Sequence, residues 1–177
     1  MERMFRTLRA DEIEAKVKQV KPNGLVLLLY KTARTDMDLL DETVGAANWE
    51  NDYREIKGNL YAGIGIKQED GRMVWKWDCG VESREDGEGN EKKGEASDSF
   101  KRAGFRWGIG RELYTSPFIW IPAAKCEIVN GKCNDKFSVE AIAYDDNGKI
   151  RALAIRNDTQ AQKQGKNVRA FVWQAQQ

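Results

Sequence analysis

The spacing of apolar residues near the start of the chain predicts a short helix followed by a strand. Ile13, Val17 and Val20 recur at helical spacing after an acidic start, so residues 10–20 are expected to form an amphipathic helix. The turn-forming residues Pro22-Asn23-Gly24 would end it. The apolar run at residues 25–30 then predicts a short buried strand, because alternation with polar residues is absent there.

A second helix is predicted over residues 31–44. Its apolar positions Ala33, Met37, Leu40 and Val44 fall at i, i+4, i+7 and i+11, which places them on one helical face. Gly45 follows directly, and glycine is the residue that most often ends a helix.

The period changes at residues 49–81, where β-rich runs are separated by two turn signals, Lys57-Gly58-Asn59 and Glu69-Asp70-Gly71. This pattern predicts three antiparallel strands at about 50–56, 60–68 and 72–80. In the third strand a set of mostly apolar residues alternates with a more polar set, which predicts one buried and one solvent-facing side. The first set is Met73, Trp75, Trp77 and Cys79, and the second is Val74, Lys76 and Asp78.

The remaining pattern predicts a charged loop, a long helix and a hairpin. Residues 82–95 carry no apolar side chain and are expected to form a mobile loop or hairpin tip, before a helix at about 95–107. A turn at Asp146-Asn147-Gly148 pairs residues 137–144 with 149–157, residues 158–166 are polar, and residues 168–173 predict a last strand. The expected fold class is α+β: an antiparallel three-stranded meander packed on a long helix, with an N-terminal helical segment and a C-terminal β-hairpin.

Composition narrows the class of protein. A chain of 177 residues with 41% hydrophobic content is expected to fold as a single domain, 1–177, with a core at 1–122 and added strands at 123–177. Lysine and arginine number 29 against 28 acidic residues, so any binding to nucleic acid must come from a local patch. The sequence has neither an apolar run of membrane-spanning length nor a signal-like N-terminus, and we expect a cytoplasmic protein without a membrane partner.

The absence of histidine removes imidazole bases, imidazole metal ligands and the common histidine-activated nucleophiles. The three cysteines fit no zinc or disulfide spacing and are interpreted as reduced structural thiols. We therefore expect no catalytic residues, no metal and no cofactor.

The helix at 95–107 carries the most informative surface. Phe100, Ala103, Gly104 and Trp107 share one arc of a helical wheel, and Lys101, Arg102, Phe105 and Arg106 share the opposite arc. The first arc is the expected core face, with Gly104 allowing close approach to the sheet. The second arc is either an ordinary solvated surface or a site where cations hold phosphates and Phe105 stacks on a base or on a neighbouring subunit.

Three segments, in this order, resemble a known family. TARTDMDLLDETVGAANW (32–49), KWDCGVES (76–83) and GEASDSFKRAGFRWGIGRELY (94–114) are similar to single-strand annealing proteins of the Rad fifty-two superfamily, in its bacteriophage branch. With the strands between them they cover about residues 8–122. The resemblance implies a homo-oligomeric ring or helical filament that binds single-stranded DNA and anneals complementary strands without ATP. A phage exonuclease or a single-strand binding protein is an expected further partner.

The resemblance also assigns roles to particular residues. Lys101 and Arg102 match the lysine–arginine pair on the floor of the family's DNA groove, and a further basic position one turn later falls on Phe105, with Arg106 beside it. Arg34 matches a family arginine only with a one-residue shift, and its alternative is a weak surface pair with Asp38. Lys92 and Lys93 either reach a second strand or belong to a solvated loop tip.

Two other functions remain open. Asp36, Asp38, Asp41 and Glu42 form an acidic cluster that suggests a metal-dependent nuclease, although they do not converge on a helical wheel. Alternatively, the basic helix docks an acidic partner protein without any DNA. The sequence contains no phosphate-binding G-x-x-x-x-G-K-[ST] loop.

Overall fold

The computed structural model describes residues 4–80 and 91–176, with side chains from residue 94 onward in the second segment. The chain divides into two compact units. The meander unit contains Lys31–Gly110 and the described part of Met1–Arg6, and the six-stranded unit contains Thr7–Tyr30 and Arg111–Gln177. That the whole chain folds as one cooperative domain stays a prediction.

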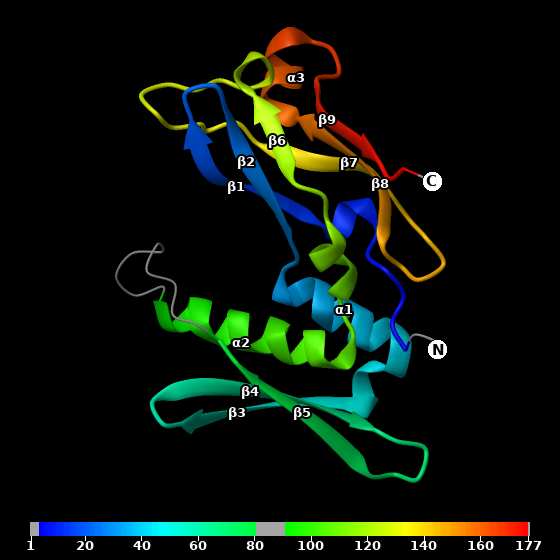
Figure 1. Ribbon diagram of the computed structural model, residues 1–177. Helices are drawn as coiled ribbons and strands as arrows, with labels where there is room; N and C mark the ends of the chain where they lie inside the picture. The colour runs from blue at the N-terminus through cyan, green and yellow to red at the C-terminus, as the bar shows by residue number, and fades with distance from the viewer. Residues whose placement is uncertain (1–3, 81–90, 177) are drawn as a thin grey trace. The chain divides into compact units, whose positions relative to one another are not determined.

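The meander unit contains the predicted three-stranded antiparallel sheet (Figure 1). Its strands are β3 (Trp49–Ile56), β4 (Asn59–Lys67) and β5 (Met73–Cys79), in the order β3-β4-β5. Lys57 and Gly58 both have positive φ angles, 52° and 75°, as the tight turn between β3 and β4 requires. The strand and turn predictions for this region are confirmed.

The long helix α2 (Glu91–Trp107) lies across the sheet and contacts β4 and β5, as Figure 1 shows. It begins at Glu91, earlier than the expected start at about residue 95. Phe100 and Ala103 are fully buried from the helix side, and Ile64 and Ile66 are almost fully buried from β4. The predicted packing of a meander on a long helix is therefore confirmed.

The side of β5 that faces α2 is the more polar one. Lys76 pairs with Ile64 and Asp78 pairs with Ala62, so both side chains lie on the α2 side of the sheet. Trp75 and Trp77 consequently lie on the opposite side. The alternation is confirmed, but the aromatic set does not form the surface that packs on the helix.

Helix α1 (Ala33–Val44) packs beside α2 within the same unit. Thr32 caps its N-terminus, because the Thr32 hydroxyl accepts a hydrogen bond from the Thr35 amide, and Gly45 with φ 86° caps its C-terminus. The predicted apolar face is partly wrong. Met37 is 38% exposed, whereas Asp36, Leu39 and Leu40 are buried. The carboxylate of Asp36 can be buried because it is paired with Lys31.

The expected role of Gly104 is also corrected. A Cβ atom at this position would lie 2.3 Å from the Asp36 carboxylate, so Gly104 makes room for α1 rather than for the sheet. Close approach of α2 to the sheet occurs at Gly80, where a Cβ atom would lie 2.4 Å from the Glu95 carbonyl oxygen.

The six-stranded unit is a nearly closed antiparallel sheet that was not predicted. Its edge strands β6 and β9 also contact each other. Its core includes Leu25, Leu27, Ile121 and Ile155. The strands are β1 (Glu14–Lys21), β2 (Gly24–Tyr30), β6 (Ile119–Pro122), β7 (Phe137–Tyr144), β8 (Ile150–Asn157) and β9 (Arg169–Gln174), in the order β6-β2-β1-β7-β8-β9. Strands from both sides of residue 122 thus share one sheet.

The predicted helix over residues 10–20 is wrong. Ala10–Glu12 form a short 3-10 helix, η1, and strand β1 follows. The register of β1 against β2 shifts between Val17 and Gln19. This bulge places Val17 and Val20 on the same side of the strand, so a three-residue spacing that imitates a helix arises in a strand.

The hairpin and the last strand predicted for the C-terminal half are confirmed, but the helix within the polar segment was not predicted. Strands β7 and β8 form the expected hairpin, and β9 is the expected last strand. The polar segment after β8 contains a short helix, α3 (Asp158–Gln164), whose first turn is capped by the Asn157 side chain. Three further 3-10 turns are η2 (Ala46–Asn48), η3 (Arg111–Thr115) and η4 (Ala123–Lys125). Within residues 4–80 and 91–176, no helix has the length and apolar character needed to cross a membrane.

Candidate nucleic-acid interface

Two arginines of α2 share one carboxylate of β5. Arg102 and Arg106 are one helical turn apart, so they lie on the same face of α2. The Arg102 Nε atom lies 3.5 Å from Oδ1 of Asp78, and the Arg106 Nε atom donates a hydrogen bond to Oδ2 at 3.0 Å. We call Lys76, Asp78, Arg102 and Arg106 the arginine cluster.

Lys76 completes the cluster and is held against the end of α2. Its ammonium group donates to the Arg106 carbonyl at 3.2 Å and lies 4.3 Å from the centre of the Trp107 ring. The Trp107 indole N–H in turn donates to the Ile64 carbonyl at 2.9 Å. These contacts hold the last turn of α2, which carries Arg106, against the sheet.

The cluster is cationic and accessible. The cluster contains three cations and one carboxylate, so its net charge is +2, and the carboxylate contacts both arginines. The side chains of Arg102 and Arg106 are 48% and 56% exposed, whereas that of Asp78 is 13% exposed. Ion pairs this exposed are worth about 0–1 kcal/mol, so an incoming phosphate can compete with Asp78 for either guanidinium group.

Lys101 is not part of this cluster. Its ammonium group lies 3.9 Å from the Asp98 carboxylate, and its side chain is 27% exposed. Its main-chain carbonyl accepts a hydrogen bond from Lys31 at 3.3 Å. The structure therefore separates the expected pair: Arg102 joins Arg106 at Asp78, while Lys101 belongs to the part of α2 near α1.

Beneath Lys101 lies a buried ion pair between Lys31 and Asp36. The Lys31 ammonium group donates to both carboxylate oxygens at 2.6 Å, and the two side chains are 8% and 0% exposed. Burial raises the pKa of Asp36 to about 6, although the charges of Lys31 and Lys101 act in the opposite direction. This pair is part of the interior of the unit and is not available to a ligand.

The other predicted DNA-binding residues are scattered. Phe105 is half-buried on α2, and Arg34 is exposed on α1. Within the described residues, no ion pair joins Arg34 to Asp38, so the alternative of a surface pair between them is not found. Lys92 and Lys93 lie in the first turn of α2, but their side chains, like the preceding residues 81–90, fall outside the described part of the chain.

The acidic side chains of α1 contact different residues and do not gather at one place. Asp36 is paired with Lys31, Asp41 accepts a hydrogen bond from the Trp49 indole at 2.7 Å, and Glu42 accepts two from Arg6. Among the residues that the structure describes, no group of three or more histidine, cysteine, aspartate or glutamate side chains is arranged to hold a metal ion. The geometry gives the nuclease alternative no specific support.

Sequence reasoning missed Asp78 and Lys76 as site residues. A signal was present, because Lys76 and Asp78 alternate with the tryptophans of β5 and must share a side of the sheet. What the alternation could not show was that this side faces α2. With that fact, Asp78 becomes the natural partner of the arginines one turn apart on the helix.

Comparisons with known proteins add no further information. No family model, no curated protein and no solved structure matches this chain. Evidence on function therefore comes from the arginine cluster and from the sequence resemblance to annealing proteins.

Proposed function

We propose that this chain binds single-stranded DNA through the arginine cluster and promotes the annealing of complementary strands without ATP. The observation that carries the proposal is the pair of half-exposed guanidinium groups of Arg102 and Arg106 that share the single carboxylate of Asp78. Guanidinium groups bind phosphate oxygens with good geometry and do so regardless of base sequence.

Binding of this kind supports annealing through electrostatics. Cations that neutralise phosphates reduce the repulsion between two strands, and contacts limited to the backbone leave the base edges available for pairing. Pairing of the bases then supplies the free energy. Single-strand affinity should fall with salt by about 0.7 log units per log unit of salt for each phosphate neutralised.

One cluster reaches only a short piece of DNA, so the proposal includes repetition of the site in an oligomer. A ring or helical filament would place equivalent clusters along one strand, as the resemblance to annealing proteins implies. Lys101 and Arg34 are proposed to extend the cationic surface, together with Lys92 and Lys93, and Phe105 to contact a base or the next subunit. The process served is recombination or repair in a phage or prophage, within the cytoplasm of a bacterial host.

The test compares two double variants in a binding and annealing assay. Arg102→Ala/Arg106→Ala removes both guanidinium groups of the cluster. Arg72→Ala/Arg156→Ala removes the same charge from two other exposed arginines that also pair with aspartates. Affinity for a labelled oligonucleotide is measured across a salt series, and annealing of complementary strands is followed without ATP.

The cluster variant should bind at least tenfold more weakly, with a flatter salt dependence, and should anneal more slowly, while the control variant resembles wild type. Equal losses in both variants would show that net charge matters and the cluster does not. No binding by the wild type would favour a protein-docking role, and shortening of the oligonucleotide when Mg²⁺ is added would favour a nuclease.

A further inference from the structure

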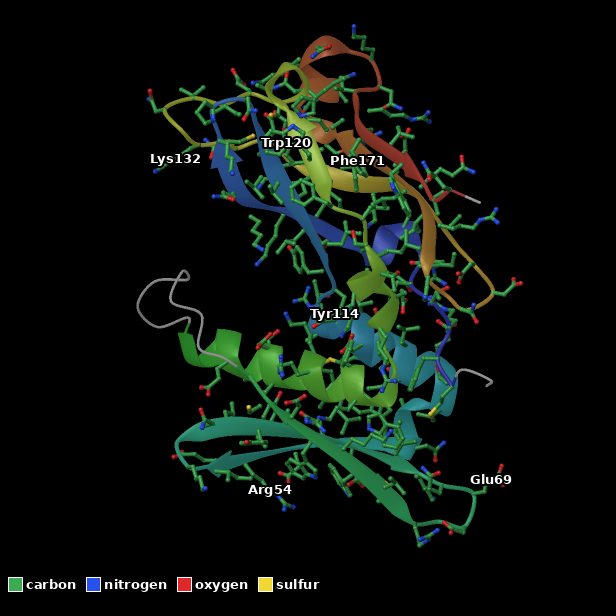
Figure 2. The ribbon with its side chains drawn as sticks, in the orientation of Figure 1. Arg54, Glu69, Tyr114, Trp120, Lys132 and Phe171 are labelled. Carbon is green, nitrogen blue, oxygen red and sulfur yellow. The ribbon has the colours of Figure 1, made fainter. Side chains whose placement is uncertain are left out.

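The side of the sheet that faces away from α2 carries two adjacent tryptophans. Trp75 and Trp77 lie two residues apart on β5, and their ring centres are 5.6 Å apart with planes inclined by 25°. Both are half-buried. Arg54 of β3 lies on this side as well, as Figure 2 shows, with its guanidinium carbon 4.4 Å from the centre of the Trp77 ring. We call Arg54, Trp75 and Trp77 the tryptophan face.

Two glycines of β4 explain how the indole rings lie. Trp77 pairs with Gly63 and Trp75 pairs with Gly65. A Cβ atom at Gly63 would lie 2.6 Å from the Trp77 ring, and one at Gly65 would lie 2.7 Å from the Trp75 ring. Each indole therefore rests on the bare backbone of the middle strand and covers the glycine with its inner surface. The Arg54 guanidinium group lies over the outer surface of Trp77, so the outward-facing area combines the Trp75 ring with this guanidinium plane.

We infer that the tryptophan face is a stacking site for unpaired nucleobases, a second contact that rests on the proposed single-strand binding for the identity of its ligand. Nucleobases stack on indole rings and on guanidinium planes whatever their sequence. Stacking uses the flat surface of a base and leaves its pairing edge available, which is compatible with annealing.

The charges around the tryptophans favour bases over phosphates on this side of the sheet. Glu50 pairs with Gly65 and Asp52 pairs with Gly63, so two carboxylates lie in the same cross-strand rows as the indoles. Two cations lie on the same side: Arg54 lies 3.2 Å from Asp52, and Lys67 pairs with Met73 in the row next to Trp75, so the two carboxylates and two cations leave no net charge. A phosphate gains little where the charges cancel, whereas an uncharged π surface gains contact with an indole ring and with the guanidinium plane.

The tryptophan face and the arginine cluster are linked through one strand. β5 is an edge strand of the sheet order β3-β4-β5, with Lys76 and Asp78 on its α2 side and Trp75 and Trp77 on the other. A nucleic acid strand that crosses this edge presents phosphates to the arginine cluster and bases to the indoles. The two sites thus divide backbone binding from base binding.

The experiment uses two labelled oligonucleotides of equal length and equal phosphate number. One is oligo(dT), and the other is an abasic analogue with tetrahydrofuran sugars. Wild-type protein should bind oligo(dT) more tightly by at least about fivefold, the low end for stacking on one ring. Trp75→Leu/Trp77→Leu should lower oligo(dT) affinity toward the abasic value and leave abasic binding unchanged.

Two variants serve as controls. Tyr53→Leu removes a 41% exposed aromatic ring from the opposite side of the same sheet. It should keep the wild-type ratio of oligo(dT) affinity to abasic affinity. Arg102→Ala/Arg106→Ala should weaken both oligonucleotides by the same factor. If that variant binds normally while the tryptophan variant loses the ratio, the cluster assignment fails and the stacking site stands. Persistence of the ratio in a folded tryptophan variant overturns the stacking site alone.

A measurement on the wild-type sequence covers the case in which the tryptophan variant does not fold. In protein labelled with 5-fluorotryptophan, oligo(dT) should shift the ¹⁹F resonances of Trp75 and Trp77, assigned with single phenylalanine variants, and the abasic oligonucleotide should not. Resonances that respond equally to both, or that change only with protein concentration as a self-association surface would, overturn the inference. Failure of the wild type to bind either oligonucleotide removes both proposals.

Discussion

Replacing Asp78 with asparagine should increase affinity for single-stranded DNA. In the structure the Asp78 carboxylate occupies the position between Arg102 and Arg106 where an anion is most attracted. A phosphate that binds either guanidinium group must do so beside this negative charge. Asp78→Asn keeps the shape of the side chain and removes the charge, so the net charge of the cluster rises from +2 to +3.

The size of the effect follows from Coulomb's law. Two unit charges about 7 Å apart, as for a phosphate on the far side of a guanidinium group, repel by roughly 0.6 kcal/mol in water. Two such phosphates give about 1.2 kcal/mol, and salt reduces this to about 1 kcal/mol or less. The expected gain is roughly fivefold at low salt and smaller at high salt.

The cost to the fold should be small. The two ion pairs that Asp78 makes involve half-exposed arginines, and pairs of this kind contribute about 0–1 kcal/mol each. A shift of at most about 2 kcal/mol in the free energy of unfolding is therefore expected, measured by urea denaturation. Asp70→Asn, which removes the partner of Arg72 at 2.6 Å, is the matched control for charge.

The assay is fluorescence anisotropy with a labelled oligonucleotide over a range of salt concentrations. Wild type, Asp78→Asn and Asp70→Asn are compared under the same conditions. Weaker binding by a folded Asp78→Asn protein would refute the reasoning, because it would show that the carboxylate orients the arginines for DNA and does not compete with DNA. A gain of equal size in Asp70→Asn would show a general charge effect.

Further predictions concern the packing that supports the site. Trp107→Ala should lower the free energy of unfolding by roughly 3–5 kcal/mol, measured by urea denaturation, because it removes the ring and its bond to the Ile64 carbonyl; a loss below about 1 kcal/mol would contradict this. Gly104→Ala should cost about 1–3 kcal/mol because its methyl group would overlap the Asp36 carboxylate, and an unchanged midpoint in the same assay would refute it. Because folding raises the pKa of Asp36, proton binding by its carboxyl group stabilises the folded state. This stabilisation is fully present below about pH 4 and is lost as pH rises through about 6. Lys31→Met should therefore destabilise by about 3–5 kcal/mol at pH 8 and by less at pH 5, where Asp36 takes up a proton; equal losses at both values would argue against a charged, buried Asp36.

The meander could be predicted because its signals are local. Lys57-Gly58 and Asp70-Gly71 are adjacent residues that favour tight turns, and the strands between them need no distant partner to be recognised. Strand β1 was mistaken for a helix because its bulge between Val17 and Gln19 changes the local period, and the bulge exists only in the pairing with β2. Its neighbour β7 lies more than a hundred residues away, which no local pattern indicates.

The candidate site was predicted in part for the same reason. Arg102 and Arg106 could be found from helical spacing alone, since residues one turn apart share a face. Asp78 could not, because its role depends on which side of β5 the helix covers. Burial of Asp36 was also unpredictable from spacing, since a charged residue enters the core only where Lys31 and Gly104 are brought to it by the fold.

The pairing of β1 with β7 has a consequence for synthesis on the ribosome. The hairpin of β1 and β2 is synthesised before residues 31–110, yet its neighbour Ser138, opposite Glu14, is made only after them. Residues 31–110 form a nearly continuous unit, so they can collapse during translation and shorten the effective loop that the later strands must close. Until β7 is made, the edge of β1 has backbone hydrogen-bonding groups without their β7 partners. Nascent chains on neighbouring ribosomes can pair at this edge.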